Sequence, residues 1–415
     1  MSDLVAPTRT PAYEARLKQR YAAERRFKAL GLGAVVFAIA VLIFLLATMF
    51  ANGIGGFQRT VLEVPVDFSR MGLSVPATDD ESAIVRSLQT QGLPEIITFA
   101  TEQALGTEAA AQINSQAWRT VAEEIARNPE LVRQSSTFQL PTTADLASAY
   151  SGDGKADLQP LARELAERGA ISDAVDWGFM SRSDATDAQL VGIWGALKGS
   201  ILTMIVTLLL AFPIGVLAAL YLEEYAPRNR WTDLIEVSIN NLAAVPSIIF
   251  GLLGLAVFLV LFPGYRSAPV IGGMTLALMT MPVIVISGRN AIKAVPPSIR
   301  DGALAIGASP IQVVFHHVLP LALPGILTGT IIGMARALGE TAPLLLIGMR
   351  AFVSQPPTGF TDNATVLPMQ IFLWSDQIDR GFVERTSAAI IVLLVFLLLM
   401  NGLAIYLRNR FEKTW

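Results

Sequence analysis

The chain has 415 residues, of which 53% are hydrophobic and 16% are charged, and its mean hydropathy is +0.51. These proportions are typical of a polytopic membrane protein. We therefore expect the chain to be embedded in a lipid bilayer. A formal net charge of −3 argues against a nucleic-acid partner. The absence of cysteine excludes disulfides, thiolate metal sites and a cysteine nucleophile.

Residues 1–29 are polar and basic, and residues 30–50 form an apolar run without a charge. The run is long enough to cross about 30 Å of hydrocarbon as a helix. A cleaved signal peptide is the alternative, but its apolar core is usually shorter and no small-residue cleavage site follows. We therefore expect an uncleaved span, with residues 1–29 in the cytoplasm because of their positive charge. The basic residues are Arg9, Arg16, Lys18, Arg20, Arg25, Arg26 and Lys28.

Residues 51–191 have the composition of a soluble domain on the external, periplasmic side. Residues 58–66 alternate as in a strand, and three further stretches have the periodicity of amphipathic helices. These stretches are residues 81–91, 117–126 and 158–167. The carboxylates are scattered, and we expect Asp184 and Asp187 to be solvated surface charges. The pattern predicts an α/β or mostly α domain without a catalytic or metal site, whose removal (residues 57–188) should leave the membrane part inserted.

Five more apolar segments follow, so that six transmembrane helices are predicted in an all-α membrane domain. The segments are residues 193–222, 237–262, 269–287, 321–348 and 386–407. An even number of spans returns residues 408–415 to the cytoplasm, where Arg408, Arg410 and Lys413 agree. The loop at residues 354–384 has Arg380 as its one basic residue among four carboxylates, which suits the outer side.

The cytoplasmic stretch at residues 288–320 is polar and amphipathic. We expect two short helices with a turn at Gly307, because glycine adopts turn conformations without strain. Leu319-Pro320 is expected to end the second helix, because proline has no backbone N–H to donate.

This stretch resembles the EAA motif of ABC importer permeases. The positions that carry the resemblance are Asp301, Gly302 and Ala303 at the triplet, Gly307 at the glycine, and Leu319 and Pro320 at the end. Asp301 replaces Glu, Gly302 replaces Ala, and His317 stands where the motif has Ile. The resemblance implies a helix-turn-helix that docks into a groove on an ATP-hydrolysing subunit. An ordinary amphipathic loop helix is the alternative.

Two features of the apolar run at residues 321–348 stand out. Arg336 and Glu340 are four residues apart, so they share one helix face within the hydrocarbon layer. A charged side chain in the hydrocarbon layer costs free energy and must face protein or water. The pair is therefore either a structural ion pair or a site where Arg336 interacts with an anion during its passage. Small residues at Gly329, Gly333 and Gly339 permit close helix approach, either within the subunit or between two subunits.

Residues from about 194 to the C-terminus resemble the PstA-type permeases of bacterial phosphate importers. The resemblance rests on Tyr221–Tyr225, Pro246–Leu252, Ala335–Pro343 and Leu367–Phe372. It implies the ABC type I importer permease fold in the bacterial inner membrane. It also implies a PstC-type second permease, ABC ATPase subunits that bind ATP and Mg, and a periplasmic phosphate-binding protein. Arg336 and Glu340 correspond to charged positions implicated in translocation.

The sequence thus predicts a permease of inorganic phosphate that works by alternating access. The chain is not expected to be an enzyme or to bind a cofactor or metal, because it has no Walker A sequence and its two histidines, His316 and His317, are adjacent in a loop. A permease for another oxyanion, such as sulfate or molybdate, is one alternative. A membrane-anchored sensor or scaffold whose external domain does the work is another.

Overall fold

The computed structural model describes residues 11–411 apart from positions 79, 153–154, 350–351 and 378–380. The predicted topology also relied on three basic residues that lie outside the described residues: Arg9, Arg380 and Lys413. The chain forms two compact units, Met1–Asn52 and Gly53–Trp415.

Most of helix α1 (Pro11–Gly55) belongs to the first unit. The helix is 45 residues long, and its portion from Leu17 has the length and hydropathy of a membrane span. It begins well before the predicted span at residues 30–50. The added length is rich in Ala, Glu, Lys and Arg, which favour helix independently of hydrophobicity.

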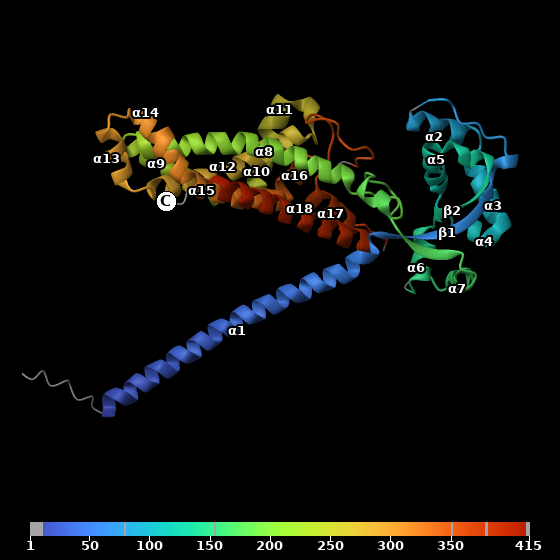
Figure 1. Cartoon of the computed structure of the whole chain (residues 1–415), viewed down its shortest axis with the longest axis horizontal. Coiled ribbons are helices and arrows are strands. Elements are labelled where there is room, and N and C mark those ends of the chain that lie inside the picture. The colour runs from blue at the N-terminus through green and yellow to red at the C-terminus, as the bar shows by residue number, and fades with distance from the viewer. Residues whose placement is uncertain (1–10, 79, 153–154, 350–351, 378–380, 412–415) are drawn as a thin grey trace, which may run out of the picture. The chain divides into compact units, whose positions relative to one another are not determined.

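The second unit begins with a three-stranded antiparallel sheet of order β2-β1-β3 (Figure 1). The strands are β1 (Gln58–Asp67), β2 (Ser135–Pro141) and β3 (Ile171–Val175). Along the central strand β1, Leu62, Val64 and Val66 are buried while Glu63 is exposed, which is the period-two pattern of a half-buried strand. Residues 58–66 were predicted as a strand for this reason.

Six helices and short 3₁₀ turns complete the external domain. They are α2 (Glu81–Thr90), α3 (Leu93–Leu105), α4 (Thr107–Ala110), α5 (Ala117–Arg127), α6 (Ala144–Tyr150), α7 (Gln159–Glu167), η1 (Phe68–Arg70), η2 (Pro129–Arg133) and η3 (Trp177–Met180). Helices α2, α5 and α7 coincide with the three predicted helices. The strands and helices of this domain enclose one apolar core. Within it the rings of Phe68 and Phe138 pack edge to face, with their centroids 5.5 Å apart.

The remaining helices form the membrane domain. They are α8 (Trp194–Leu220), α9 (Arg230–Ala243), α10 (Ser247–Leu253), α11 (Leu259–Leu261), α12 (Pro269–Lys293), α13 (Pro297–Ala305), α14 (Pro310–Gln312), α15 (Leu319–Gly339), α16 (Ala342–Leu346), α17 (Leu367–Ser375) and α18 (Gly381–Phe411), with π-helical turns η4 (Tyr221–Tyr225), η5 (Gly254–Phe258) and η7 (Val313–Val318) and the 3₁₀ turn η6 (Pro263–Tyr265). Helix α12 packs between α8 and α15, and α15 packs on α18 (Figure 1). Small residues allow the close approach: a Cβ at Gly273 of α12 would overlap Val206 of α8.

Among the described residues, five helices, α1 included, are long and apolar enough to cross a membrane, and the number of spans is six if a bent pair of helices is counted as one span. Residues 237–262 were predicted as one continuous span. Instead, α9 and the helix that starts at Ser247 meet at an angle of 104°. Pro246 explains the break, because proline disfavours helical geometry at the preceding residue and cannot donate to the helix ladder.

A buried carboxylate joins the external domain to the membrane helices. The side chain of Asp176, directly after β3, is fully buried and pairs with Arg182 at 2.7 Å and with Arg385 of α18 at 3.1 Å. Arg59 of β1 lies 4.0 Å from the same carboxylate. Arg385 also donates to the carbonyl oxygens of Ala188 at 2.9 Å and Gly56 at 2.7 Å.

Aromatic packing reinforces this junction. Phe179 packs edge to face on Phe57 at 5.5 Å and contacts Trp374 of α17 at 6.3 Å. Trp374 in turn contacts Phe382 of α18 at 6.1 Å. Removal of residues 57–188 would therefore take away Asp176 and Phe179 and leave Arg385 buried without its partner. The boundary that keeps the junction lies inside the sheet.

The register of the sheet suggests a smaller deletion that keeps Asp176 and its arginine partners. Thr60 of β1 faces Asp173 of β3 in the antiparallel pair. Replacing residues 61–172 by Asn-Gly would close a two-residue hairpin and keep the whole junction. We expect this variant to insert and to give a single sharp peak in size-exclusion chromatography in detergent.

The matched control is the wider deletion of residues 57–188 closed by a short linker. We expect it to aggregate or to melt at a much lower temperature, because leaving a buried charge without its partner costs about 3–5 kcal/mol. Equal behaviour of the two deletions would contradict a structural role for the Asp176 junction.

Candidate functional site

The loop between α12 and α15 folds into the short helix α13 and the start of a second helix, with a turn at Gly307 between them. Gly307 has a φ of +89°, a conformation that residues with a side chain rarely adopt. Ser309 caps the second helix: its hydroxyl accepts from the backbone N–H of Gln312 at 3.4 Å, and the Gln312 side chain accepts from the Ser309 N–H at 2.9 Å. This reciprocal capping box fixes where the second helix begins.

The second helix does not end at Leu319-Pro320, contrary to the sequence-based expectation. Helix α14, the π turn η7 and α15 run on as one helix from Pro310 to Gly339. A π turn shifts the hydrogen-bond register by one residue. Because η7 lies directly before Pro320, the helix accommodates a residue that has no N–H to donate.

The predicted motif residues of α13 divide between two faces. Asp301 and Gly302 are exposed, and a Cβ at Gly302 would meet open space. Ala303 is 5% exposed and belongs to the apolar core that contains Val313 and Val314 of η7. The inner face of α13 thus packs on the second helix, and the outer face is free to meet another molecule.

Large apolar side chains are exposed on this loop. Ile306 is 83% exposed and Ile311 is 64% exposed, and Leu304 and Phe315 are also exposed. We call these four residues the loop patch. Sequence reasoning missed it, although the signal was present as apolar residues on the polar side of an amphipathic stretch. Exposed apolar clusters of this kind mark protein interaction sites.

Arg336 and Glu340 lie together, with Arg336 Nε 3.5 Å from Glu340 Oε1. The two are not on one helix as predicted, because α15 ends at Gly339 and Glu340 has an extended backbone as its C-cap. Arg336 is in the last turn, where the negative end of the helix dipole favours a cation. Its side chain is 48% exposed, so this long pair is not a buried structural bridge.

The two faces of α15 differ in character. Gly329 and Gly333 are buried against α12, where an added Cβ would overlap Ser287 and approach Thr280. On the other face Ile332, Arg336 and Gly339 are exposed. The glycines therefore serve packing within the subunit, except for Gly339, beside which a Cβ would meet open space.

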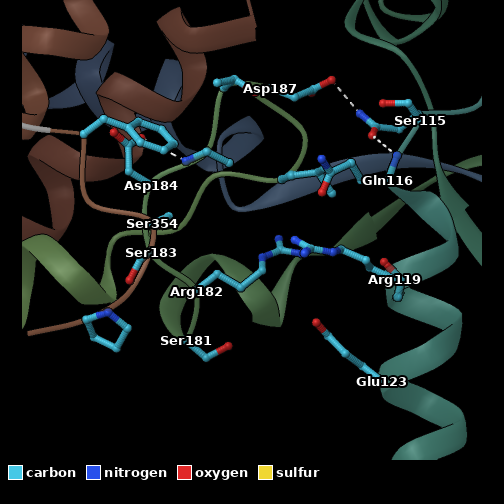
Figure 2. Close-up of a pocket in the computed structure, with 17 residues that line it drawn as sticks. Ser115, Gln116, Arg119, Glu123, Ser181, Arg182, Ser183, Asp184, Asp187 and Ser354 are labelled. Carbon is cyan, nitrogen blue, oxygen red and sulfur yellow. Dashed lines mark hydrogen bonds between the residues drawn. The ribbon is translucent and has the colours of Figure 1, made fainter. Parts of the chain in front are cut away.

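A pocket of about 700 Å³ lies where α5 of the external domain faces the segment between η3 and α8 (Figure 2). Arg119 and Arg182 extend toward each other from opposite walls, and Glu123, Asp184 and Asp187 also line it. The carboxylates outnumber the guanidinium groups, so the pocket does not have the positive charge of an anion site. Its polar lining suits a partner surface of mixed charge.

Asp184 and Asp187 were expected to be solvated, and both are instead half-buried and hydrogen-bonded. Asp184 accepts from the Trp374 indole N–H at 3.0 Å, and Asp187 accepts from the Asn114 amide at 2.5 Å. Burial raises the pKa of Asp184, and the hydrogen bond from Trp374 partly opposes this rise. Asp187 thereby ties the loop before α8 to the external domain.

Nothing in the described part of the chain forms a cluster of histidine, aspartate or glutamate that could hold a metal ion. His316 and His317 are exposed in η7. Two exposed surfaces of the described membrane helices stand out: the loop patch and the charged face of α15.

Two protein families match the chain. Residues 193–413 match the family described as binding-protein-dependent transport system inner membrane component. Residues 14–160 match DUF3333, a domain of unknown function.

Individual relatives agree with the first of these matches. A probable ABC transporter permease protein of Bacillus subtilis, YqgI, is 33% identical over 197 residues, which are 47% of this chain and 66% of the relative. The phosphate transport system permease protein PstA of Mycobacterium leprae is 30% identical, with 53% of this chain and 71% of the relative covered. PstA of Pasteurella multocida is 31% identical, with 51% and 74% covered.

Solved structures of transporters resemble the chain more weakly. A chain of the inward-facing MetNI methionine ABC transporter has a TM-score of 0.44 and 18% identity and covers 53% of this chain and 98% of its own length. A bacterial alginate ABC transporter in complex with its periplasmic protein has a TM-score of 0.41 and 18% identity, with 53% and 79% covered.

Substitutions of the glycines of α15 test how α15 packs against α12. We expect Gly329→Ala to lower stability by about 1–3 kcal/mol, because the new methyl group would overlap the Ser287 side chain on α12. Gly339→Ala is the control in the same helix and should be neutral or slightly stabilising, because nothing lies within 4 Å. Thermal unfolding in detergent measures both. Equal melting temperatures for the two variants would show that Gly329 does not fix the contact between α12 and α15.

Proposed function

Because this chain belongs to the family of binding-protein-dependent transport system inner membrane components, as a PstA-type permease of ABC importers, we propose that it is one permease subunit of an ATP-driven importer of inorganic phosphate. The relatives named for phosphate transport support the choice of substrate. Phosphate is handed over by a periplasmic binding protein and crosses the membrane by alternating access.

One observation carries the assignment of a translocation role to α15. The Arg336 side chain is 48% exposed at the end of an apolar helix, and its one ion pair among the described residues is a long one, with Glu340. A guanidinium is not stable against hydrocarbon, so this face requires a second protein surface or water. A second permease subunit of PstC type that covers this face, with a water-filled path between the two, satisfies that requirement.

Arg336 then serves the passage of the anion. Phosphate carries one to two negative charges at neutral pH and meets a large barrier in a low-dielectric region. A guanidinium offers two parallel N–H donors to a pair of phosphate oxygens. Glu340 orients the guanidinium and limits its affinity, so that the anion is attracted without being retained.

The loop patch is the contact with the ATPase. Ile306 and Ile311 project from a loop whose turn is set by Gly307 and whose second helix continues directly into α15. We assign ATP and Mg to the partner ATPase and none to this chain. With that loop in the cytoplasm, both termini are cytoplasmic and residues 51–191 are periplasmic.

Another oxyanion, such as sulfate or molybdate, is the alternative substrate. A single guanidinium beside a carboxylate does not distinguish one tetrahedral oxyanion from another by charge or geometry. Competition of unlabelled sulfate and molybdate with radiolabelled phosphate uptake in proteoliposomes that contain the whole assembly decides between them.

The role of Arg336 predicts graded effects on transport. We expect Arg336→Gln to lower the initial rate of phosphate uptake by about tenfold or more, equivalent to about 1.4 kcal/mol or more of lost barrier stabilisation. Arg336→Lys keeps the charge and loses the two parallel donors, so its rate should lie between those of Arg336→Gln and the wild type.

The control is expression and thermal stability, since the exposed pair contributes little to folding. A purely structural pair would behave differently: both single variants would be unstable, and the charge swap Arg336→Glu with Glu340→Arg would restore folding and uptake. Wild-type uptake by well-folded Arg336→Gln would exclude the translocation role.

The loop patch predicts a separate effect on assembly. We expect Ile306→Glu to leave the permease folded, because this side chain is 83% exposed, and to abolish co-purification of the ATPase. Arg228→Glu alters another exposed side chain, between η4 and α9, and should not affect assembly. Quantitative co-purification from detergent measures both variants, and an Ile306→Glu complex with a full complement of ATPase would show that the patch is not the docking contact.

A further inference from the structure

A charged network lies beside the loop that carries the loop patch. The π turn η4 at the end of α8 presents two consecutive carboxylates, Glu223 and Glu224. Consecutive side chains of a helical turn point in different directions, so each of the two carboxylates pairs with a different arginine. Arg289 of α12 lies 3.4 Å from Glu223, and Arg300 of α13 lies 2.7 Å from Glu224.

The Arg300 side chain is fully engaged. Its Nη2 donates to Glu224 at 2.7 Å and its Nε donates to the same carboxylate at 3.2 Å. Nη2 and Nη1 also donate to the carbonyl oxygens of Ile292 at 3.0 Å and Val295 at 2.7 Å, at the end of α12. The side chains of Arg300 and Glu224 are 23% and 13% exposed, so solvent screens this pair far less than a surface pair.

Arg289 extends the network to a further helix. Its guanidinium reaches Glu236 of α9 at 3.0 Å as well as Glu223 of η4. Two arginines and three glutamates therefore link four elements: η4 after α8, α9, α12 and α13. Residues 224 and 300 are far apart in the chain, so the ion pair rather than a covalent connection links α13 to α8.

The faces of α13 show what this link can do. Arg300 and Ala303 are three residues apart and lie on the inner face, while Asp301, Gly302 and Leu304 are exposed on the outer face. A molecule that binds the outer face pushes or pulls on a helix whose inner face is bonded to α8 and α12. Without the bonds of Arg300, the movement of α13 would be taken up by the Pro296-Pro297 connection and the turn at Gly307.

We propose that Arg300 and Glu224 are positioning residues that transmit movement of the docked ATPase to α8 and α12, and so couple ATP hydrolysis to transport. The proposal rests on the function proposed above, because it requires an ATPase on the outer face of α13. The action of Arg300 and Glu224 is mechanical: they keep α13 in one fixed orientation on the ends of two membrane helices.

The coupling is measured in proteoliposomes that contain the complete importer and the binding protein. We expect Glu224→Gln to lower the number of phosphate ions transported per ATP hydrolysed by about fivefold or more, the lower end of typical coupling between sites. Binding of the ATPase should remain at the wild-type level, since the loop patch is untouched. The double variant Glu224→Gln with Arg300→Gln should behave like Arg300→Gln alone, because two residues that act as one unit are not additive.

Asp233→Asn is the matched control, because it neutralises an exposed carboxylate of the neighbouring helix α9. It should transport and hydrolyse as the wild type does. A merely structural pair would lower the melting temperature and reduce uptake and ATP hydrolysis in parallel. An unchanged ratio of transport to hydrolysis in Glu224→Gln would therefore overturn the proposal.

A second measurement does not depend on the substrate. The chain has no cysteine, so spin labels can be placed directly at Ser298→Cys on α13 and Arg228→Cys after η4. We expect one narrow distance distribution in the otherwise wild-type chain and a broad one with Glu224→Gln. A narrow distribution in both would refute the positioning role, whereas failure of the wild type to take up phosphate would refute only the proposed substrate.

Discussion

A charged side chain in or beside the hydrocarbon layer needs an opposite charge, a set of hydrogen bonds or water, because its transfer unpaired into a low-dielectric medium is costly. This constraint accounts for three of the charged clusters among the described residues. Asp176 pairs with arginines at the junction before α8, Arg336 has Glu340 beside the exposed face of α15, and Arg300 has Glu224 at the loop between α12 and α15.

The three clusters differ in burial: the pairs of Asp176 are the most buried, and the Arg336–Glu340 pair is the most exposed. The Asp176 side chain is fully buried and that of Arg385 is 3% exposed, which suits a permanent junction. The Arg336 side chain is half exposed on a face that nothing in the described part of the chain covers. A cation that must attract and release an anion has to remain accessible, whereas a cation that only holds two segments together does not.

The external domain is joined to the membrane helices by more than a linker. Its central strand begins directly after α1, and the residues around η3 pack on α17 and α18 through Phe179 and Trp374. The domain is therefore positioned rigidly enough to share the pocket lined by Arg119 and Arg182 with the loop before α8. The surface of this domain is therefore held in place on α17 and α18.

Periodicity and composition determined much of the architecture. The apolar runs predicted most of the membrane helices, the alternation at residues 58–66 predicted β1, and Gly307 marked the turn in the loop between α12 and α15. These features are local: a run of apolar residues, a period of two and a glycine with positive φ depend on neighbours in the chain. The loop that resembles the EAA motif and the Arg336–Glu340 pair could be singled out for the same reason, since their members are close in sequence.

Only the tertiary structure decided which distant residues meet. The partners of Asp176 come from β1, from the loop before α8 and from α18, and no pattern along the chain connects them. Asp184 was expected to be exposed to solvent, but it is half-buried and accepts a hydrogen bond from Trp374. The helix continues through Pro320 because the preceding π turn changed the hydrogen-bond register. Sequence alone determined which segments are helical and apolar. The pairing of buried charges depends on how those segments pack, because a charge is stabilised by whichever partner the fold brings within reach.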